Sequence, residues 1–182
     1  MNQTSDLTER TLSREEKYQG SFLSLHVDQV QLPNGRTSIR EVVEHVDGVA
    51  ILALDDRNNV LTVTQYRYVF GRPLLEIPAG KLEPGEDPVS GALRELKEET
   101  GAVPDTFLPM GVVLPSPGCL GERLHLFLAR GLHMEKQHLD EDEFLNVERI
   151  PFSEMVHRVM DGEIEDGKTI AAVLKAKVLL DL

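Results

Sequence analysis

The residues of this sequence that most clearly could do chemistry are acidic side chains at helical spacing. Glu95, Glu98 and Glu99 lie at positions i, i+3 and i+4, so they share one face if the segment is helical. Each like-charged pair on a helix face costs about 0.2–0.5 kcal/mol, and such a cluster therefore favours a bound cation. Hard divalent cations such as Mg²⁺ take oxygen ligands and commonly bind together with substrate phosphates. The cluster predicts a metal site for a phosphate-containing substrate.

Residues around the cluster support this interpretation. Glu86 lies on the approach to the helix and can join the carboxylates, and Arg94 is spaced to hold one of them in place. Gly80 and Gly85 allow the preceding loop to fold tightly over the helix start. The alternative is a solvated acidic face, as on many helices rich in Glu and Lys. Against it, Lys97 is the only lysine of the predicted helix and forms no alternating i,i+4 ladder.

The helix that must position these residues is predicted over residues 88–100. Asp87 is a favourable N-cap, Pro88 suits the first helical position, and Gly101 follows the last turn. An apolar stripe at spacings of four, three and four is expected to face the core. It consists of Val89, Leu93, Leu96 and Thr100.

The remaining pattern predicts a mixed α/β fold of the sandwich type. A doubly wound sheet is disfavoured, because the predicted strands follow one another as hairpins. A continuous apolar run over 49–54 indicates a buried strand. Further strands are expected at 60–66, 74–77, 124–129 and 144–150, and helices at 153–160, capped by Ser153, and at 168–180.

The N-terminal region is predicted to form a separate arm. Residues 23–32 and 37–43 read as two strands of an antiparallel β-hairpin joined at Pro33-Asn34-Gly35, which is a turn signal. Residues 1–17 are polar and are expected to be loosely held. An arm over 1–45 has too little core of its own, so we expect it to serve dimerisation, with a second domain over 46–182.

Composition excludes several classes of protein. The 182 residues are 41% hydrophobic and 27% charged, as in an ordinary globular protein. With 19 Lys and Arg against 31 Asp and Glu, the net charge is −12, which disfavours nucleic acid as a partner. The single cysteine, Cys119, suits a reducing compartment. We find neither a signal-peptide pattern nor an apolar run of the roughly 20 residues that span a bilayer, and expect a cytoplasmic protein with no membrane partner.

The stretch from Gly80 to Ala102 resembles the signature of the Nudix hydrolases. Their box is G-x5-E-x7-R-E-U-x-E-E-x-G-U, where U is aliphatic, and here it begins at Gly80, continues through Glu86 and ends in Arg94–Ala102. Every fixed position matches, and the one soft departure is Ala102, which is smaller than the usual aliphatic residue. The resemblance implies an α/β/α sandwich with a mixed sheet. It also implies hydrolysis of a nucleoside diphosphate linked to another group, with Mg²⁺, or Mn²⁺ as a substitute.

Flanking residues are similar to the ADP-ribose pyrophosphatase subgroup of that family. Pro117 lies fifteen residues after Ala102, where this subgroup carries a proline, although an ordinary turn would explain it as well. Agreement extends to stretches 40–44, 65–67, 76–80 and 139–144. The subgroup implies cleavage of ADP-ribose to AMP and ribose 5-phosphate by a homodimer with exchanged arms.

Other activities fit the same box. A broader nucleoside diphosphate sugar hydrolase would prefer GDP-mannose or ADP-glucose, and a house-cleaning enzyme would hydrolyse nucleoside triphosphates. A capped-RNA hydrolase is disfavoured by the acidic net charge. A regulator that kept the fold without the activity would need a DNA-binding domain or a broken box, and this chain shows neither.

The resemblance also implies roles for individual residues. The metal ligands are the Ala79 carbonyl, Glu95 and Glu99, with Glu98 as ligand to a second ion or as the group that orients water. Gly80, Glu86, Arg94 and Gly101 are the structural residues of the box. Arg40, Arg67, Glu76 and Glu122 are expected around the diphosphate and sugar, and Phe22 is expected to stack on the base. Glu141 is the first candidate for the general base, and Glu143 is the second.

Overall fold

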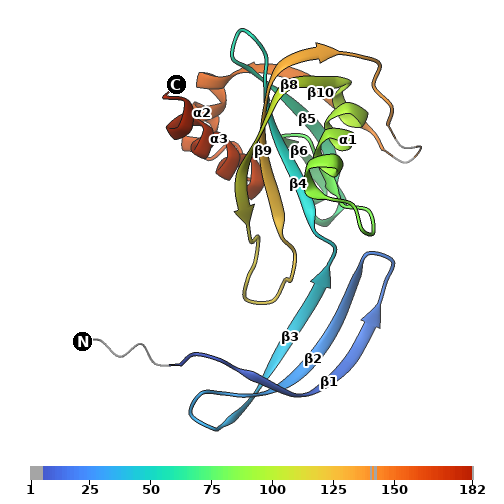
Figure 1. Ribbon diagram of the computed structural model, residues 1–182, viewed down its shortest axis with the longest axis vertical. Helices are drawn as coiled ribbons and strands as arrows, with labels where there is room; N and C mark the ends of the chain where they lie inside the picture. Colours follow the sequence, from blue (N-terminus) through green and yellow to red (C-terminus); the bar gives the residue numbers. More distant parts are fainter. Residues whose placement is uncertain (1–5, 140, 142, 182) are drawn as a thin grey trace. The chain divides into compact units, whose positions relative to one another are not determined.

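The computed structural model describes residues 6–139, 141 and 143–181, which form two compact units. One unit contains the residues up to Val46 together with Ser116–Glu122, and the other contains Asp47–Pro115 and Arg123–Leu182. Their strands and helices carry the labels of Figure 1.

The first unit is an antiparallel sheet of three strands, in the order β1-β2-β3. The strands are β1 (Arg10–Gln19), β2 (Leu23–Gln31) and β3 (Thr37–His45). The predicted hairpin corresponds to β2 and β3, but the expectation of loosely held residues over 1–17 is wrong for β1, which pairs with β2 along its length. Every residue of β1 is exposed, so the strand has no apolar alternation that could have revealed it. Residues 1–5 of that expectation lie outside the described residues.

A group of four ionisable side chains, two of them buried, links these three strands. His26 and Asp28 are 3% and 5% exposed. Arg14 donates from Nε to Asp28 Oδ1 at 3.0 Å and from Nη1 to Glu44 Oε1 at 2.8 Å. His26 Nδ1 lies 3.0 Å from Asp28 Oδ1, and its Nε2 lies 3.0 Å from Glu44 Oε1. We call Arg14, His26, Asp28 and Glu44 the arm cluster, which holds β1, β2 and β3 together.

The second unit is built on a mixed sheet of seven strands. Five of them follow the order β10-β5-β4-β9-β8, while β6 pairs with β5 and β7 pairs with β4. Only β4 and β9 are parallel among the strand pairs of the described chain. The strands are β4 (Gly48–Leu54), β5 (Asn59–Arg67), β6 (Arg72–Glu76), β7 (Ala79–Lys81), β8 (Ala102–Val113), β9 (Leu124–Met134) and β10 (Leu145–Pro151), with a short 3₁₀ helix over Tyr68–Phe70.

Helices cover both faces of this sheet (Figure 1). The central strand β4 is buried throughout and sends alternate side chains to two separate cores. Ile51 packs with Ala92 and Leu96 of α1 (Pro88–Thr100). On the other side, the core contains residues of α2 (Phe152–Met160) and α3 (Gly167–Leu180). The predicted fold class, an α/β/α sandwich preceded by an N-terminal antiparallel β-hairpin, is confirmed, with β1 extending the hairpin to a three-stranded sheet.

Helix α1 begins and ends as predicted, but its buried stripe differs. The Asp87 carboxylate accepts hydrogen bonds from the N–H groups of the first turn, and Gly101 ends the helix at φ +74°. Val89 is 46% exposed and Leu93 is half-buried, so the expectation for these two is wrong. Buried instead are Gly91, Ala92, Glu95, Leu96, Glu99 and Thr100. The helix therefore buries two carboxylates of the acidic face.

Two other elements depart from the sequence prediction. Strand β8 was not predicted, because Pro104 and Pro109 interrupt its pattern and its register shifts between Pro109 and Gly111. Helix α2 is preceded by Pro151, which makes no side-chain cap, so Ser153 is not the N-cap.

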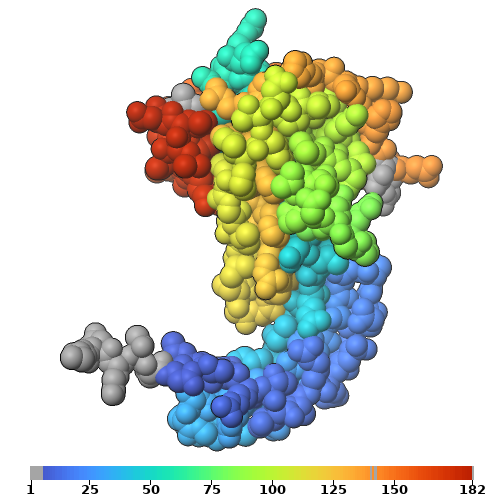
Figure 2. Space-filling model, viewed as in Figure 1, coloured from blue at the N-terminus to red at the C-terminus, as the bar shows by residue number. Residues whose placement is uncertain are grey.

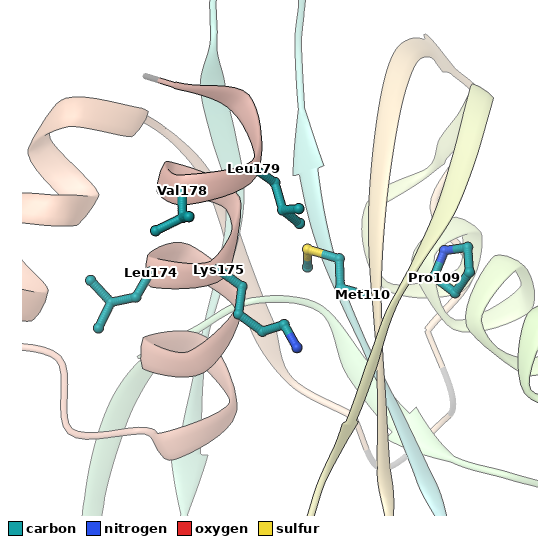
Figure 3. A pocket seen from close by; sticks show the side chains of 6 residues that line it. All are labelled: Pro109, Met110, Leu174, Lys175, Val178 and Leu179. Carbon is teal, nitrogen blue, oxygen red and sulfur yellow. The ribbon is translucent and has the colours of Figure 1, made fainter.

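Beside β8, a groove is lined by Pro109, Met110, Leu174, Lys175, Val178 and Leu179 (Figure 3).

Candidate active site

The site is built where the segment between β6 and β7 meets helix α1. Three successive residues of this segment are held through their backbone by different elements. Ile77 N donates to Thr169 Oγ1 at 2.9 Å, the Pro78 carbonyl accepts from Ile51 N at 2.9 Å, and Ala79 N donates to Glu99 Oε2 at 3.0 Å. The backbone around Ala79 is thus fixed beside the acidic face of α1.

Glu95 and Glu99 are buried on that face. They are 9% and 2% exposed. Burial raises the pKa of Glu99 to about 8; the Ala79 N–H acts against this rise, and the charges of Glu95 and Glu143 add to it. Burial also raises the pKa of Glu95, although Arg94 acts in the opposite direction. For both carboxyl groups, the nearby positive charge does not offset the effect of burial on the pKa.

Arg94 is the cation within the acidic face. Its Nη1 donates to Glu95 Oε1 and to Glu98 Oε2, both at 2.9 Å. Its Nε and Nη2 donate to the two carboxylate oxygens of Glu86, also at 2.9 Å. We call Glu86, Arg94, Glu95, Glu98 and Glu99 the helix cluster. Three of these four carboxylates share one guanidinium, and the fourth, Glu99, accepts from Ala79 N, so the helix cluster carries an excess of negative charge when ionised.

The donor set of the helix cluster suits a divalent cation. All its candidate ligands are carboxylate or carbonyl oxygens, which hard cations prefer. Gly80 passes so close to Glu95 that a Cβ would overlap its carboxylate, so only glycine permits this approach. Arg94 holds two of the candidate ligands, Glu95 and Glu98. Among the described residues, no group of three His, Cys, Asp or Glu side chains is already arranged as the ligands of a metal ion. The outer face of α1 is open to solvent in Figure 2.

The segment that leads to Glu141 and Glu143 is attached to the end of α1. Glu135 N donates to the Gly101 carbonyl at 2.6 Å, and His138 N donates to the Glu98 carbonyl at 3.0 Å. Glu141 lies in an exposed turn, and the exposed Glu143 raises the pKa of both buried glutamates of the helix cluster by its charge. Asp140 and Asp142, from the same predicted acidic loop, lie outside the described residues.

A second buried network surrounds Glu76, which is 1% exposed. Arg67 donates from Nε and Nη2 to its two oxygens at 2.6 and 2.5 Å, and Lys168 Nζ donates to it and to Asp166. Burial acts to raise the pKa of Glu76, but Arg67 and Lys168 together hold it below its usual value. Sequence analysis missed Asp166, Lys168 and Thr169; the one local signal was the Asp that caps α3.

The other predicted substrate residues belong to the first unit. The rings of Phe22 and His45 meet edge to face with centroids 5.4 Å apart, and His45 Nδ1 lies 3.7 Å from Glu122 Oε1. Arg40 is paired with Glu9 in this structure. Phe22 and Glu122 are thus brought together around His45, whereas Arg40 is engaged elsewhere in the sheet.

Pro117 lies in a turn of the same unit. Cys119 N and Leu120 N both donate to the Ser116 carbonyl, and Val43 N donates to the Cys119 carbonyl at 2.7 Å. The turn therefore packs against the end of β3.

Comparison with known proteins decides the family. Residues 44–173 match the NUDIX domain, and residues 9–43 match the nucleoside diphosphate sugar hydrolase N-terminal domain. The chain belongs to the Nudix family. The expected enzyme class, a Nudix pyrophosphatase, is confirmed with it. Among the described residues of this Nudix protein, no helix has both the length and the apolar character needed to cross a membrane.

Relatives share most of the chain. An ADP-ribose pyrophosphatase of Bacillus subtilis is 41% identical, covering 92% of this chain and 91% of the relative. A methanol dehydrogenase activator of Bacillus methanolicus is 41% identical, covering 91% and 90%. A GDP-mannose pyrophosphatase of Yersinia enterocolitica is 36% identical, covering 77% and 78%. A crystal structure of an ADP compounds hydrolase shares the fold, with a TM-score of 0.85, 21% identity and coverage of 98% and 97%.

Proposed function

We propose that this Nudix protein is a Mg²⁺-dependent hydrolase of ADP-ribose and related nucleoside diphosphate sugars. The observation that carries the proposal is the pair of buried glutamates, Glu95 and Glu99, beside the fixed backbone of Ala79. Their unbalanced negative charge suits a divalent cation, and such a cation suits a diphosphate substrate. Similarity to ADP-ribose pyrophosphatases along nine tenths of the chain supports this choice of substrate. The products would be AMP and ribose 5-phosphate.

The helix cluster divides into ligands and supporting residues in this proposal. The Ala79 carbonyl, Glu95 and Glu99 hold the cation, and Glu98 binds a second ion or orients water. Glu86 fixes Arg94, since the two form a bidentate pair. When bound, the cation would neutralise diphosphate charge and lower the pKa of a bound water. Mn²⁺ has the same preference for oxygen ligands and is proposed as a substitute.

Several residues are proposed to recognise the substrate, each on the strength of the family resemblance. Arg67 and Arg40 are proposed to bind the diphosphate or the terminal ribose, because guanidinium groups pair with phosphate through two hydrogen bonds. Phe22 is proposed to stack on the base, and Glu122 to contact the terminal sugar. Glu76 is proposed to act through Arg67, which it binds with both oxygens.

The general base is proposed to come from the pair Glu141 and Glu143. Family resemblance favours Glu141. The charge of Glu143 acts on both Glu95 and Glu99, which supports Glu143. Single Gln variants of the two residues separate these assignments.

A homodimer formed through the N-terminal arm is part of the proposal. Tyr18, Leu25 and Val43 are cross-strand neighbours on β1, β2 and β3, and Ile39 on β3 is 63% exposed. Such apolar surface on a thin sheet suits burial against a second copy. We expect sedimentation as a dimer at micromolar concentration, and a monomer there would contradict this part of the proposal.

The decisive experiment compares candidate substrates on the full chain. Purified protein with excess Mg²⁺ is given ADP-ribose, GDP-mannose, ADP-glucose and a nucleoside triphosphate, and products are separated by chromatography. We expect the highest kcat/KM for ADP-ribose, with AMP released and activity lost in a chelator. GDP-mannose is the second candidate because of the Yersinia relative. Cleavage of the triphosphate alone would contradict the proposal.

A further inference from the structure

The first turn of α3 makes contacts that the hydrolase reaction does not yet explain. Helix α3 covers the face of the sheet opposite to α1 (Figure 1). Even so, Thr169 of its first turn is fully buried and bonds the segment that leads to Ala79. Residues outside the Nudix box therefore reach the backbone of the candidate metal site.

The Thr169 hydroxyl links the backbone of Ile77 to the side chain of Asp166. It accepts a hydrogen bond from Ile77 N at 2.9 Å and donates to Asp166 Oδ2 at 2.5 Å. Asp166 also accepts from Thr169 N at 3.0 Å, as the N-cap of α3. The hydroxyl cannot turn away from Ile77 without losing one of these bonds, so its position is well determined.

The link ends two residues before the proposed carbonyl ligand. Pro78 restricts the backbone between Ile77 and Ala79, because its φ is fixed near −65° and the residue before it is restricted as well. The Pro78 carbonyl and the Ala79 N–H are held in turn by Ile51 and Glu99. With the Ile77 contact and the pairing of Ala79 with β4, each residue of this short segment is held.

We propose that Thr169 is a positioning residue for the metal site, acting through Ile77 on the Ala79 carbonyl. The proposal rests on the function proposed above, since the role of Ala79 belongs to it. Lys168 adds to the same contact, because it bonds both Glu76, which directly precedes Ile77, and Asp166. The first turn of α3 thus holds the segment at two points, the side chain of Glu76 and the main-chain N–H of Ile77.

The test uses two substitutions at Thr169 and a matched control. Thr169→Val keeps the branched shape but leaves Ile77 N without its acceptor, whereas Thr169→Ser keeps the hydroxyl. Thr62 provides the control: it is fully buried on β5, and its hydroxyl donates to the Glu148 carbonyl at 3.3 Å. Thr62→Val therefore removes a buried hydroxyl of the same type from the same unit without touching the site.

Metal affinity is the deciding measurement. Mn²⁺ binding is titrated by electron paramagnetic resonance on the full chain without substrate, and thermal unfolding is recorded for each variant. We expect Thr169→Val to weaken Mn²⁺ binding by about tenfold or more, the range typical for residues that support metal ligands. Thr169→Ser should bind like the wild type, and Thr62→Val should lower Tm without changing Mn²⁺ affinity.

The outcomes separate this inference from the proposed function. A Thr169→Val protein with a lower Tm that binds Mn²⁺ as tightly as the wild type would show a purely structural role and overturn the inference. A wild type that binds Mn²⁺ but hydrolyses no nucleotide sugar would overturn the proposed function, while the effect of Thr169→Val on binding would still support the inference. A wild type that binds no Mn²⁺ would overturn both.

Discussion

The arm cluster and the helix cluster hold their carboxylates in opposite ways. In the arm cluster, Asp28 and Glu44 are matched by Arg14 and by both ring nitrogens of His26. Hydrogen bonds from Arg14 and His26 hold the pKa values of these two acids below their usual range. In the helix cluster, three of the four glutamates share Arg94, the fourth accepts from a backbone N–H, and the pKa values of the two buried ones are raised. Buried charge that the chain itself balances is structural, whereas charge left unbalanced is suited to a ligand.

The largest effect should follow from removing a charge of the helix cluster. Glu99→Gln and Glu95→Gln should each lower kcat by about 10²–10³-fold at saturating Mg²⁺, because each variant loses a proposed metal contact. Steady-state assays across a Mg²⁺ series measure this. Unfolding by urea serves as the control, and it should show a folded protein. Retention of more than about a tenth of wild-type kcat by Glu99→Gln would refute the ligand role.

The candidate bases give the next largest effect. The Gln variant of the true base should lower kcat by about 10²-fold or more with little change in KM, because the lost proton transfer belongs to the transition state. Glu141→Gln and Glu143→Gln are compared under the same conditions. The variant of the other residue should stay close to the wild type. If both variants turn over normally, the base lies elsewhere, and Glu98 becomes the next residue to test.

A cation should stabilise the protein through the helix cluster and not through the arm cluster. With free Mg²⁺ at 100 times its Kd, the free energy of unfolding should rise by about 2.7 kcal/mol. Urea unfolding with and without chelator measures the increase. The increase should vanish in Glu95→Gln/Glu99→Gln. Its persistence in that double variant would place the bound ion at another site.

The smallest predicted effect is a difference in pH dependence between the two clusters. Because the pKa of Glu99 is raised to about 8, the folded metal-free protein takes up a proton that the unfolded chain does not hold, and stability should fall as the pH rises toward 8. Asp28 and Glu44 have lowered pKa values, so their contribution is present above their ordinary pKa values of 3.8 and 4.5 and is lost as the pH falls through the folded values. Hydrogen exchange of each unit in chelator should show these opposite trends. If the stability of both units changed in the same direction with pH, the predicted difference between the two clusters would be refuted.

Local signals made some parts of the molecule predictable. The bounds of α1 follow from Asp87, Pro88 and Gly101, which act on the backbone next to them. The buried strand β4 was evident from its apolar run. Strand β1 gave no such signal, because all its residues are exposed and it buries none of them.

The candidate site was predictable only in part, for a related reason. The glutamates of the helix cluster follow one another at helical spacing, so their shared face could be read from the sequence. Thr169 and Lys168 lie 92 residues from Ile77 and Glu76, the groups that they bind. Contacts of this separation depend on how the sheet brings α3 to the segment, and no spacing rule encodes that.

Gly101 has a consequence for how the site is held together as a whole. Its missing side chain leaves room for the Glu135 carbonyl, and the neighbouring N–H of Glu135 returns a hydrogen bond to Gly101. The strand that leads toward Glu141 and Glu143 is therefore tethered to the helix that carries Glu95 and Glu99. The approach to the candidate bases is thus fixed, as far as His138, by the helix that carries the candidate ligands, and transplanting the site to another scaffold would require residues 135–138 as well as the box.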